Sequence, residues 1–290
     1  MQYNIIQYGQ NLMIKIFNKI NYIINNEINI NLQNLDNIIK LMYESESKNL
    51  SHNEYRVVVC SSPILEYNFP SQACYSVNDC ACHGTASDYT LKHGDIVSID
   101  ISFCIIIFYK ENEVAKHHFD SANTYFIKYQ NDLSEQNLED IELIRFCEDT
   151  FYKSIELAQQ TAKLENRNLK YSDFGISFDY LIEKNNQSNL KYKYTICADY
   201  GGHVIGKNLH LYPFVNSSKL RNEESNEDIK EGVIFCFEPL ISVKSNNRLN
   251  QQHYMDMVKD GHFIMNKDKK NVAHYERMLV LENKKIKFIT

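Results

Sequence analysis

Residues Gly94–Phe108 read GDIVSIDISFCIIIF and alternate polar with apolar side chains, which is typical of a β-strand. This alternation places Val97, Ile99, Ile101 and Phe103 on one face, and Asp100 on the other between Ser98 and Ser102. A lone carboxylate in so apolar a strand is costly to bury. Asp100 therefore requires a cation, a metal or hydrogen-bond donors, and at this point a structural role is as reasonable as metal binding.

A second carboxylate follows on the return of the chain. After the turn-like segment KENEVAK, residues 110–116, the sequence continues as His117–Ser121, HHFDS. An antiparallel hairpin would bring Asp120 beside Asp100. Two adjacent carboxylates suit a divalent metal, although a chain with 37 acidic residues also supplies such pairs by chance.

Four further candidates lie in the C-terminal half. His203 and His210 belong to the segment GGHVIGKNLH, where glycines allow a close approach to a bound ion. Glu238 and Glu276 each lie inside an apolar, strand-like run, VIFCFEPL and HYERMLVL. Taken singly, each is more simply read as a surface or core residue.

Jointly, Asp100, Asp120, His203, Glu238 and Glu276 offer four carboxylates and one imidazole, whose formal charge balances two divalent cations. Two metals roughly 3.5–4 Å apart can activate water for hydrolysis. Oxygen ligands with one nitrogen and no thiolate favour Mn, Fe(II), Co or Zn. The residues alone do not choose among these ions.

The periodicity indicates two similar α/β halves, about residues 1–130 and 131–290, packed around a shared sheet in a single domain, 1–290. Each half begins with two helical patterns, and Asn31 and Ser172 suit helix starts. Strand-like sequence follows each helical pair. The predicted helices lie within residues 12–23, 35–42, 151–162 and 174–181.

Net charge, the length of apolar runs and the cysteine pattern argue against several classes of protein. The net charge of −6 argues against nucleic acid as the main partner. The longest apolar run, Ile101–Phe108, is far shorter than the roughly 20 residues of a membrane helix. No presequence pattern is visible, and eight cysteines without a CxxC pair indicate reduced thiols, so we expect a cytoplasmic protein.

In order and spacing, these motifs resemble those of type I methionine aminopeptidases of the M24, creatinase-like "pita-bread" family. The resemblance runs from about Tyr3 to the C-terminus. The matching segments are SVNDCACHG (76–84), GDIVSID (94–100), HFDS (118–121), GHVIG (202–206), HLYP (210–213), FCFEP (235–239), DG (260–261) and YE (275–276).

The resemblance implies an α/β fold of two pseudo-symmetric halves around a shared antiparallel sheet, and a set of residue roles. The five ligand candidates would hold two divalent ions, with Asp120 and Glu276 as bridges, and Glu238 would also take a proton from the attacking water. His83 would contact the substrate amide or leaving group, and His210 the scissile carbonyl and its oxyanion. A methionine pocket would be built from Phe69, Cys74, Leu209 and His262.

Several positions depart from the family pattern without touching a ligand. They are Thr85, Ala86, Val204, Leu211, Tyr212, His262 and Arg277. These changes affect the shape of the pocket and the surroundings of the ligands. The hairpin between Asp100 and Asp120 is also several residues longer than usual.

The function that the resemblance implies is that of a monomeric metallo-exopeptidase, a hydrolase that removes the initiator methionine from the N-termini of nascent polypeptides, including those at the ribosome. A proline-type (Xaa-Pro) aminopeptidase or prolidase of the same fold is the alternative enzyme. Such enzymes usually carry an extra N-terminal domain, whereas this chain begins almost directly at the first catalytic helices. A pita-bread binding protein with weak or lost catalysis is the non-enzyme alternative, against which all five ligands argue.

Overall fold

The structure, a computed structural model, describes residues 4–52, 54–188, 191–220, 225–244 and 254–290. The helices are α1 (Ile5–Asn26), α2 (Leu32–Leu50), α3 (Ser62–Tyr67), α4 (Glu135–Leu164) and α5 (Ser172–Ser188). The strands are β1 (Tyr55–Ser61), β2 (Cys74–Val77), β3 (Cys80–Cys82), β4 (Ile96–Tyr109), β5 (Asn112–Phe126), β6 (Tyr194–Ile196), β7 (Gly201–Val204), β8 (Leu211–Asn216), β9 (Ile234–Phe237), β10 (Leu240–Val243), β11 (Met257–Asp260), β12 (Phe263–Asn266), β13 (Val272–His274), β14 (Arg277–Glu282) and β15 (Lys285–Phe288). Helices precede strands in each half, as predicted.

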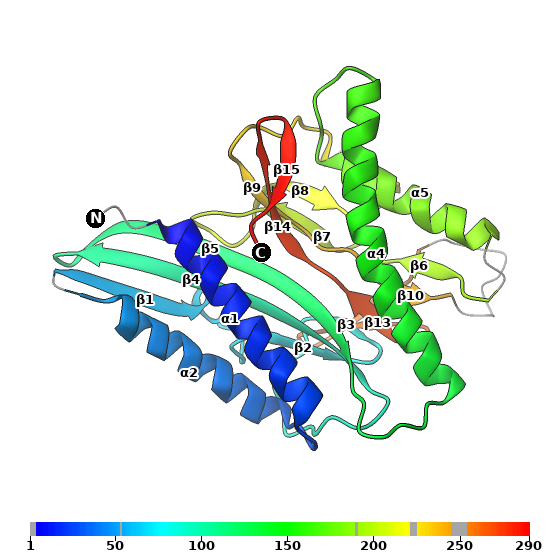
Figure 1. Ribbon diagram of the computed structural model, residues 1–290, viewed down its shortest axis with the longest axis horizontal. Coiled ribbons are helices and arrows are strands. Elements are labelled where there is room, and N and C mark those ends of the chain that lie inside the picture. The colour runs from blue at the N-terminus through cyan, green and yellow to red at the C-terminus, as the bar shows by residue number, and fades with distance from the viewer. Residues whose placement is uncertain (1–3, 53, 189–190, 221–224, 245–253) are drawn as a thin grey trace.

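The long hairpin of β4 and β5 is the central feature of the N-terminal half (Figure 1). Its turn consists of Lys110 and Glu111, whose φ angles are 46° and 68°. Two consecutive residues with positive φ reverse a hairpin in the sense that suits the twist of its strands. The turn predicted over residues 110–116 was therefore too long, because residues 112–116 already belong to β5.

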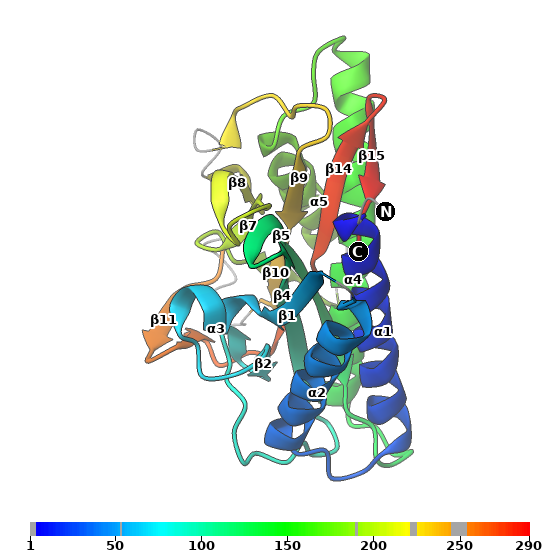
Figure 2. The ribbon, with the colours of Figure 1, turned by 90° about the vertical axis from the view of Figure 1, so that its left-hand side faces the viewer.

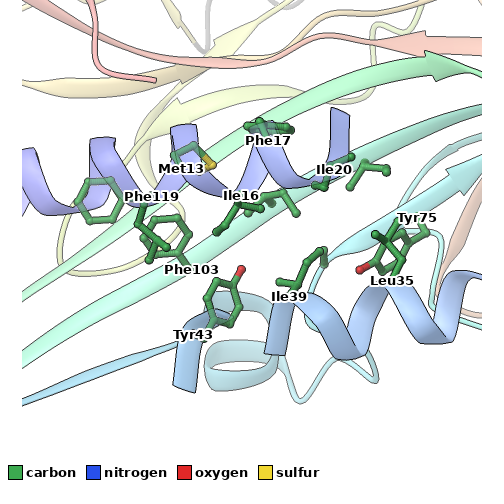
Figure 3. Packing of buried hydrophobic residues seen from close by; sticks show 14 of the residues in the cluster. Met13, Ile16, Phe17, Ile20, Leu35, Ile39, Tyr43, Tyr75, Phe103 and Phe119 are labelled. Carbon is green, nitrogen blue, oxygen red and sulfur yellow. The ribbon is translucent and has the colours of Figure 1, made fainter. Parts of the chain in front are cut away.

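Helices α1 and α2 cover one face of this hairpin (Figures 1 and 2). Figure 3 shows Ile16 of α1 beside Phe103 of β4, and Ile20 of α1 and Ile39 of α2 lie in the same buried cluster. Burial of such side chains contributes roughly 1.5–3 kcal/mol each. As predicted, Asn31 caps α2, and its side chain accepts a hydrogen bond from the Asn34 amide at 3.1 Å.

Helices α4 and α5 pack on the strands of the C-terminal half, where β15, β14, β9, β7 and β8 form one sheet (Figure 1). The core there is aromatic, and the ring of Phe151 stacks on Phe237 with centroids 5.3 Å apart. Helix α4 begins at Glu135, well before the predicted 151, with a capping box between Ser134 and Asn137. Its first two turns bury no apolar side chain, and only Leu143 and Cys147 are buried apolar residues before Phe151, so the apolar pattern there is weak.

The two halves meet in a backbone bridge between β5 and the segment that joins β13 to β14. The Glu276 amide donates to the Ala122 carbonyl at 3.1 Å, and the Ala122 amide donates to the Glu276 carbonyl at 3.3 Å. Arg277 reinforces this junction by donating to both carbonyl oxygens, at 3.0 Å to Ala122 and 2.6 Å to Glu276. This bridge places Glu276 opposite Ala122, which lies two residues along β5 from Asp120.

All eight cysteines are free thiols, and seven of them are buried, as expected of small core residues. Of the helices in the described ranges, not one is both long and apolar enough to cross a lipid bilayer.

Candidate metal centre

A cavity of about 490 Å³ opens between the two halves. It brings together all the side chains that the sequence analysis singled out, although they come from segments far apart in the chain. The predicted residues that line it are Phe69, Cys74, His83, Asp100, Asp120, His203, Leu209, His210, Glu238, His262 and Glu276.

Asp100 and Asp120 lie on neighbouring strands, as predicted, and are diagonal neighbours. Asp100 pairs with Ala122, and Asp120 pairs with Ser102. The two carboxylates are therefore offset by two residues along the strands and lie on the same face. The Ser102 hydroxyl donates to Asp120 Oδ1 at 2.5 Å. This bond orients Asp120 and leaves its other oxygen directed at His203.

The close approach of β7 and β9 brings His203 to the acids. A Cβ on Gly202 would lie 1.9 Å from the Cys236 carbonyl oxygen, so only glycine fits between these strands. His203 follows directly and is buried, with its Nε2 3.8 Å from Asp120 Oδ2 and 3.7 Å from Glu238 Oε1. Its Nδ1 lies 3.1 Å from the Val204 carbonyl, which can only accept, so Nδ1 carries the proton and the Nε2 lone pair faces the carboxylates.

The acids are buried close to one another, and this raises their pKa values. Burial raises the pKa of Asp100 to about 6. Burial, followed by the charge of a neighbouring carboxylate, raises the pKa of Asp120, Glu238 and Glu276 well above the ordinary range. Such a cluster is unfavourable without a cation, because each negative charge opposes the ionisation of the next.

Two buried carboxylate oxygens in this cavity have no hydrogen-bond partner among the described residues, namely Asp100 Oδ1 and Glu276 Oε1. Buried polar atoms are normally hydrogen-bonded, and leaving one unpaired costs about 1–3 kcal/mol, more for a charged group. Unpaired oxygens, the free Nε2 of His203 and four acids in one cavity are the donor set of a divalent cation. The residues present therefore fit a metal centre.

His83 and His210 line the same cavity, but they are not members of the groups of side chains close enough to share an ion. The hydroxyl of Tyr67 lies 2.6 Å from His210 Nδ1. The His83 ring packs edge-on against Tyr200, with centroids 5.9 Å apart. Burial lowers the pKa of both histidines, so both are neutral near pH 7.

Tyr67 is among the residues at the site that sequence reasoning missed. It lies on α3, and no local pattern in the sequence links it to His210. Cys236 and His274, each in a group of possible metal ligands, were also missed. The Cys236 thiol lies with Asp120, His203 and Glu276, and the His274 ring lies with Glu238 and Glu276, each set within 4.8 Å.

The predicted donor set, with one nitrogen and no sulfur, did not include these two side chains, which the structure places beside it. Cys236 and His274 each precede a predicted glutamate by two residues, and a strand directs such side chains to the same face. Alternation could have revealed both. Burial, together with the charge of Glu276, raises the pKa of the Cys236 thiol well above its usual range.

The four residues of the predicted methionine pocket, called the pocket wall below, all line the cavity. The rings of Phe69 and His262 pack edge to face with centroids 5.6 Å apart. Cys74 and Leu209 also line the cavity and are buried. Apart from His262, the side chains of this wall are apolar, and they line the same cavity as the acids.

A comparison with known families matches residues 27–283 to the profile of metallopeptidase family M24. The chain belongs to this family. Its relatives include a protein named methionine aminopeptidase 1b from Plasmodium falciparum, 31% identical over 79% of this chain and 38% of that protein. A methionine aminopeptidase from Clostridium perfringens is 29% identical over 74% of this chain and 71% of the relative.

Solved structures of M24 enzymes share the fold. The methionine aminopeptidase from Rickettsia prowazekii superposes with a TM-score of 0.70 over 98% of this chain and 95% of that one, at 22% identity. The prolidase from Pyrococcus furiosus superposes with a TM-score of 0.59 over 99% of this chain but 62% of its own, at 13% identity. The predicted pita-bread fold is thereby confirmed.

Membership of a metallopeptidase family and the pKa values of the acids together predict proton release on metal loading. A metal binds deprotonated carboxylates, whereas burial lowers the pKa of His203 to about 3, so this ligand is already neutral. Asp100, with a pKa of about 6, is partly protonated near pH 6 and must lose that proton when the ion enters, whereas near pH 8 it is already ionised. Binding of Co²⁺ should therefore release more protons at about pH 6 than at about pH 8, and its affinity should fall as the pH falls.

Calorimetric titration of the metal-free protein in two buffers of different ionisation enthalpy measures this release. The observed heats should differ between the buffers near pH 6 and converge at higher pH. Equal heats in both buffers near pH 6 would contradict the assignment of protonated acids.

Proposed function

We propose that this M24 metallopeptidase is a methionine aminopeptidase that removes the initiator methionine from newly made polypeptides. Asp100, Asp120, His203, Glu238 and Glu276 would hold two divalent ions chosen from Co, Mn, Fe(II) and Zn. The observation that carries this proposal is their convergence in a single cavity that also contains two neutral histidines and a largely apolar wall.

When bound, the ions supply electrostatic activation of water and of the scissile carbonyl. Asp120 and Glu276 would be the acids shared between the ions; Glu276 lies in both groups of possible ligands, and Asp120 lies in the group of His203. Glu238 would accept the proton of the attacking water.

The two histidines outside the ligand groups would act on the substrate. If the Tyr67 hydroxyl donates to His210 Nδ1, the ring proton lies on Nε2, where it can donate to an oxygen that becomes negative. His83 would donate to the amide or leaving group on the other side of the cavity. Neutral rings serve here as donors without adding a competing positive charge.

The wall of Phe69, Cys74, Leu209 and His262 would receive the methionine side chain. A thioether is apolar and polarisable, and it packs well against aromatic rings. His262 contributes ring surface to this wall, and its contact with Phe69 supports the placement.

The substrates would be N-termini of nascent polypeptides, including those still at the ribosome, and the protein would act as a monomer in the cytoplasm. The free thiols of all eight cysteines support a reducing compartment.

Peptide hydrolysis tests this function directly. The purified chain, loaded separately with Mn²⁺, Co²⁺, Fe²⁺ or Zn²⁺, is assayed for methionine release from Met-Ala-Ser and Met-Gly-Met-Met, with Ala-Pro and Met-Pro as comparison. We expect release from the first two peptides and none after chelation. Cleavage confined to the proline peptides would instead make the chain a proline-type peptidase, and no cleavage by any metal form would contradict an enzymatic role.

A further inference from the structure

His274 is the last residue of β13, and its side chain is buried. Its side chain is 3% exposed, and its Nε2 has no hydrogen-bond partner among the described residues. Thr124 Oγ1 accepts from the His274 amide and donates to the His274 carbonyl, both at 2.8 Å. The backbone is thus held firmly while the ring nitrogen is left unpaired, which is the opposite of an ordinary hydrogen-bonded core histidine.

The unpaired nitrogen faces the acids of the metal centre. His274 Nε2 lies 3.8 Å from Glu238 Oε2, which is beyond hydrogen-bond distance. His203 Nε2 lies at nearly the same distance, 3.7 Å, from the other oxygen of the same carboxylate. Glu238 is therefore flanked by two imidazoles, one at each oxygen.

Such separations are those of groups that surround an ion without touching one another. Ligand atoms at about 2.0–2.2 Å from one ion are separated from each other by more than a hydrogen bond requires. His274, Glu238 and Glu276 have ligand atoms within 4.8 Å of one another, as do His203, Asp120 and Glu276 in the neighbouring group. Glu276 belongs to both groups, and each group contains one imidazole.

We propose that His274 Nε2 is a metal ligand of the ion held by Glu238 and Glu276, so that each of the two ions has an imidazole of its own. This inference rests on the metal centre of the proposed function and adds a sixth ligand side chain to it. A second nitrogen donor favours Fe²⁺, Co²⁺ or Zn²⁺ over Mn²⁺, because affinity for imidazole rises along that series.

X-ray absorption of the unaltered protein loaded with two equivalents of Co²⁺ counts imidazoles directly. We expect one histidine per cobalt on average. Half a histidine per cobalt would overturn the inference while leaving the metal centre intact, whereas failure to bind cobalt stoichiometrically would remove the proposed function itself. This measurement needs no variant and is independent of activity.

The variant His274→Gln provides the second measurement. Calorimetric titration with Co²⁺ should show one of the two binding events weakened by at least about 10-fold. In X-ray absorption, the average count should fall from one histidine to half a histidine per cobalt. Tyr275→Phe is the matched control, because the neighbouring side chain points to the opposite face, where its hydroxyl lies 2.8 Å from that of Tyr152. An unchanged imidazole count in His274→Gln would contradict the inference, even if its cobalt affinity were lower.

Discussion

Replacing Asp120 by asparagine, or Glu276 by glutamine, is expected to lower turnover of Met-Ala-Ser more than 100-fold. Each change removes a negative charge from a side chain proposed to bridge two cations, while its size is almost unchanged. Alterations that touch only the surroundings of metal ligands already cost roughly 10–100-fold. Metal content, measured by elemental analysis, should fall with activity.

Unfolding would not explain this loss, because the same substitutions relieve repulsion in the metal-free protein. Burial and the charges of Glu276 and Asp100 raise the pKa of Asp120 well above its usual range, so a neutral amide is better tolerated there than a carboxylate. The Ser102 hydroxyl can still donate to the amide oxygen. We therefore expect the metal-free variants to melt no lower than the unaltered metal-free protein.

Asp140→Asn is the matched control for these substitutions. Asp140 is also a buried acid, and burial raises its pKa to about 6, but it lies on α4 and accepts from Gln136 Nε2 at 3.1 Å. It should keep both metal and turnover. Near-normal turnover of Asp120→Asn or Glu276→Gln would contradict the proposal that these acids hold two metal ions.

The second large effect separates the histidines by role. His203→Ala should lower both bound metal and rate, because His203 Nε2 faces two of the acids within 3.8 Å. His210→Ala and His83→Ala should keep their metal and lose kcat by roughly 10²–10³-fold, the usual cost of a lost oxyanion donor. A donor that acts mainly in the transition state changes kcat more than KM.

Elemental analysis and steady-state kinetics on the three variants check this division of roles. His93→Ala is the control, because this ring contacts the backbone of Tyr129 and Asp132 and does not line the cavity. Loss of metal in His210→Ala, or full kcat in that variant, would show that its assigned role is wrong. The ring of His210 lies 4.3 Å from that of His203, so the experiment also tests whether these neighbours act separately.

Much of the fold could be read from periodicity. Alternation in residues 94–108 predicted β4, and the spacing of apolar residues predicted α1, α2 and α5, because those patterns reflect one buried face. The beginning of α4 escaped prediction, since its first turns bury few apolar side chains. The exact turn between β4 and β5 also escaped, because it depends on backbone angles at Lys110 and Glu111 that those residue types rarely adopt.

The sequence by itself determined which residues are able to bind metal and the order in which they occur, and this order was enough to indicate the family. The roles of the ligands and of His83 and His210 stay predictions. Only the tertiary structure decided which further side chains join them. Tyr67 reaches His210 across 143 positions of the chain, and His274 faces Glu238 because β10 and β13 pair in one particular register. Such neighbours depend on long-range strand pairing and helix packing, which local residue patterns do not specify.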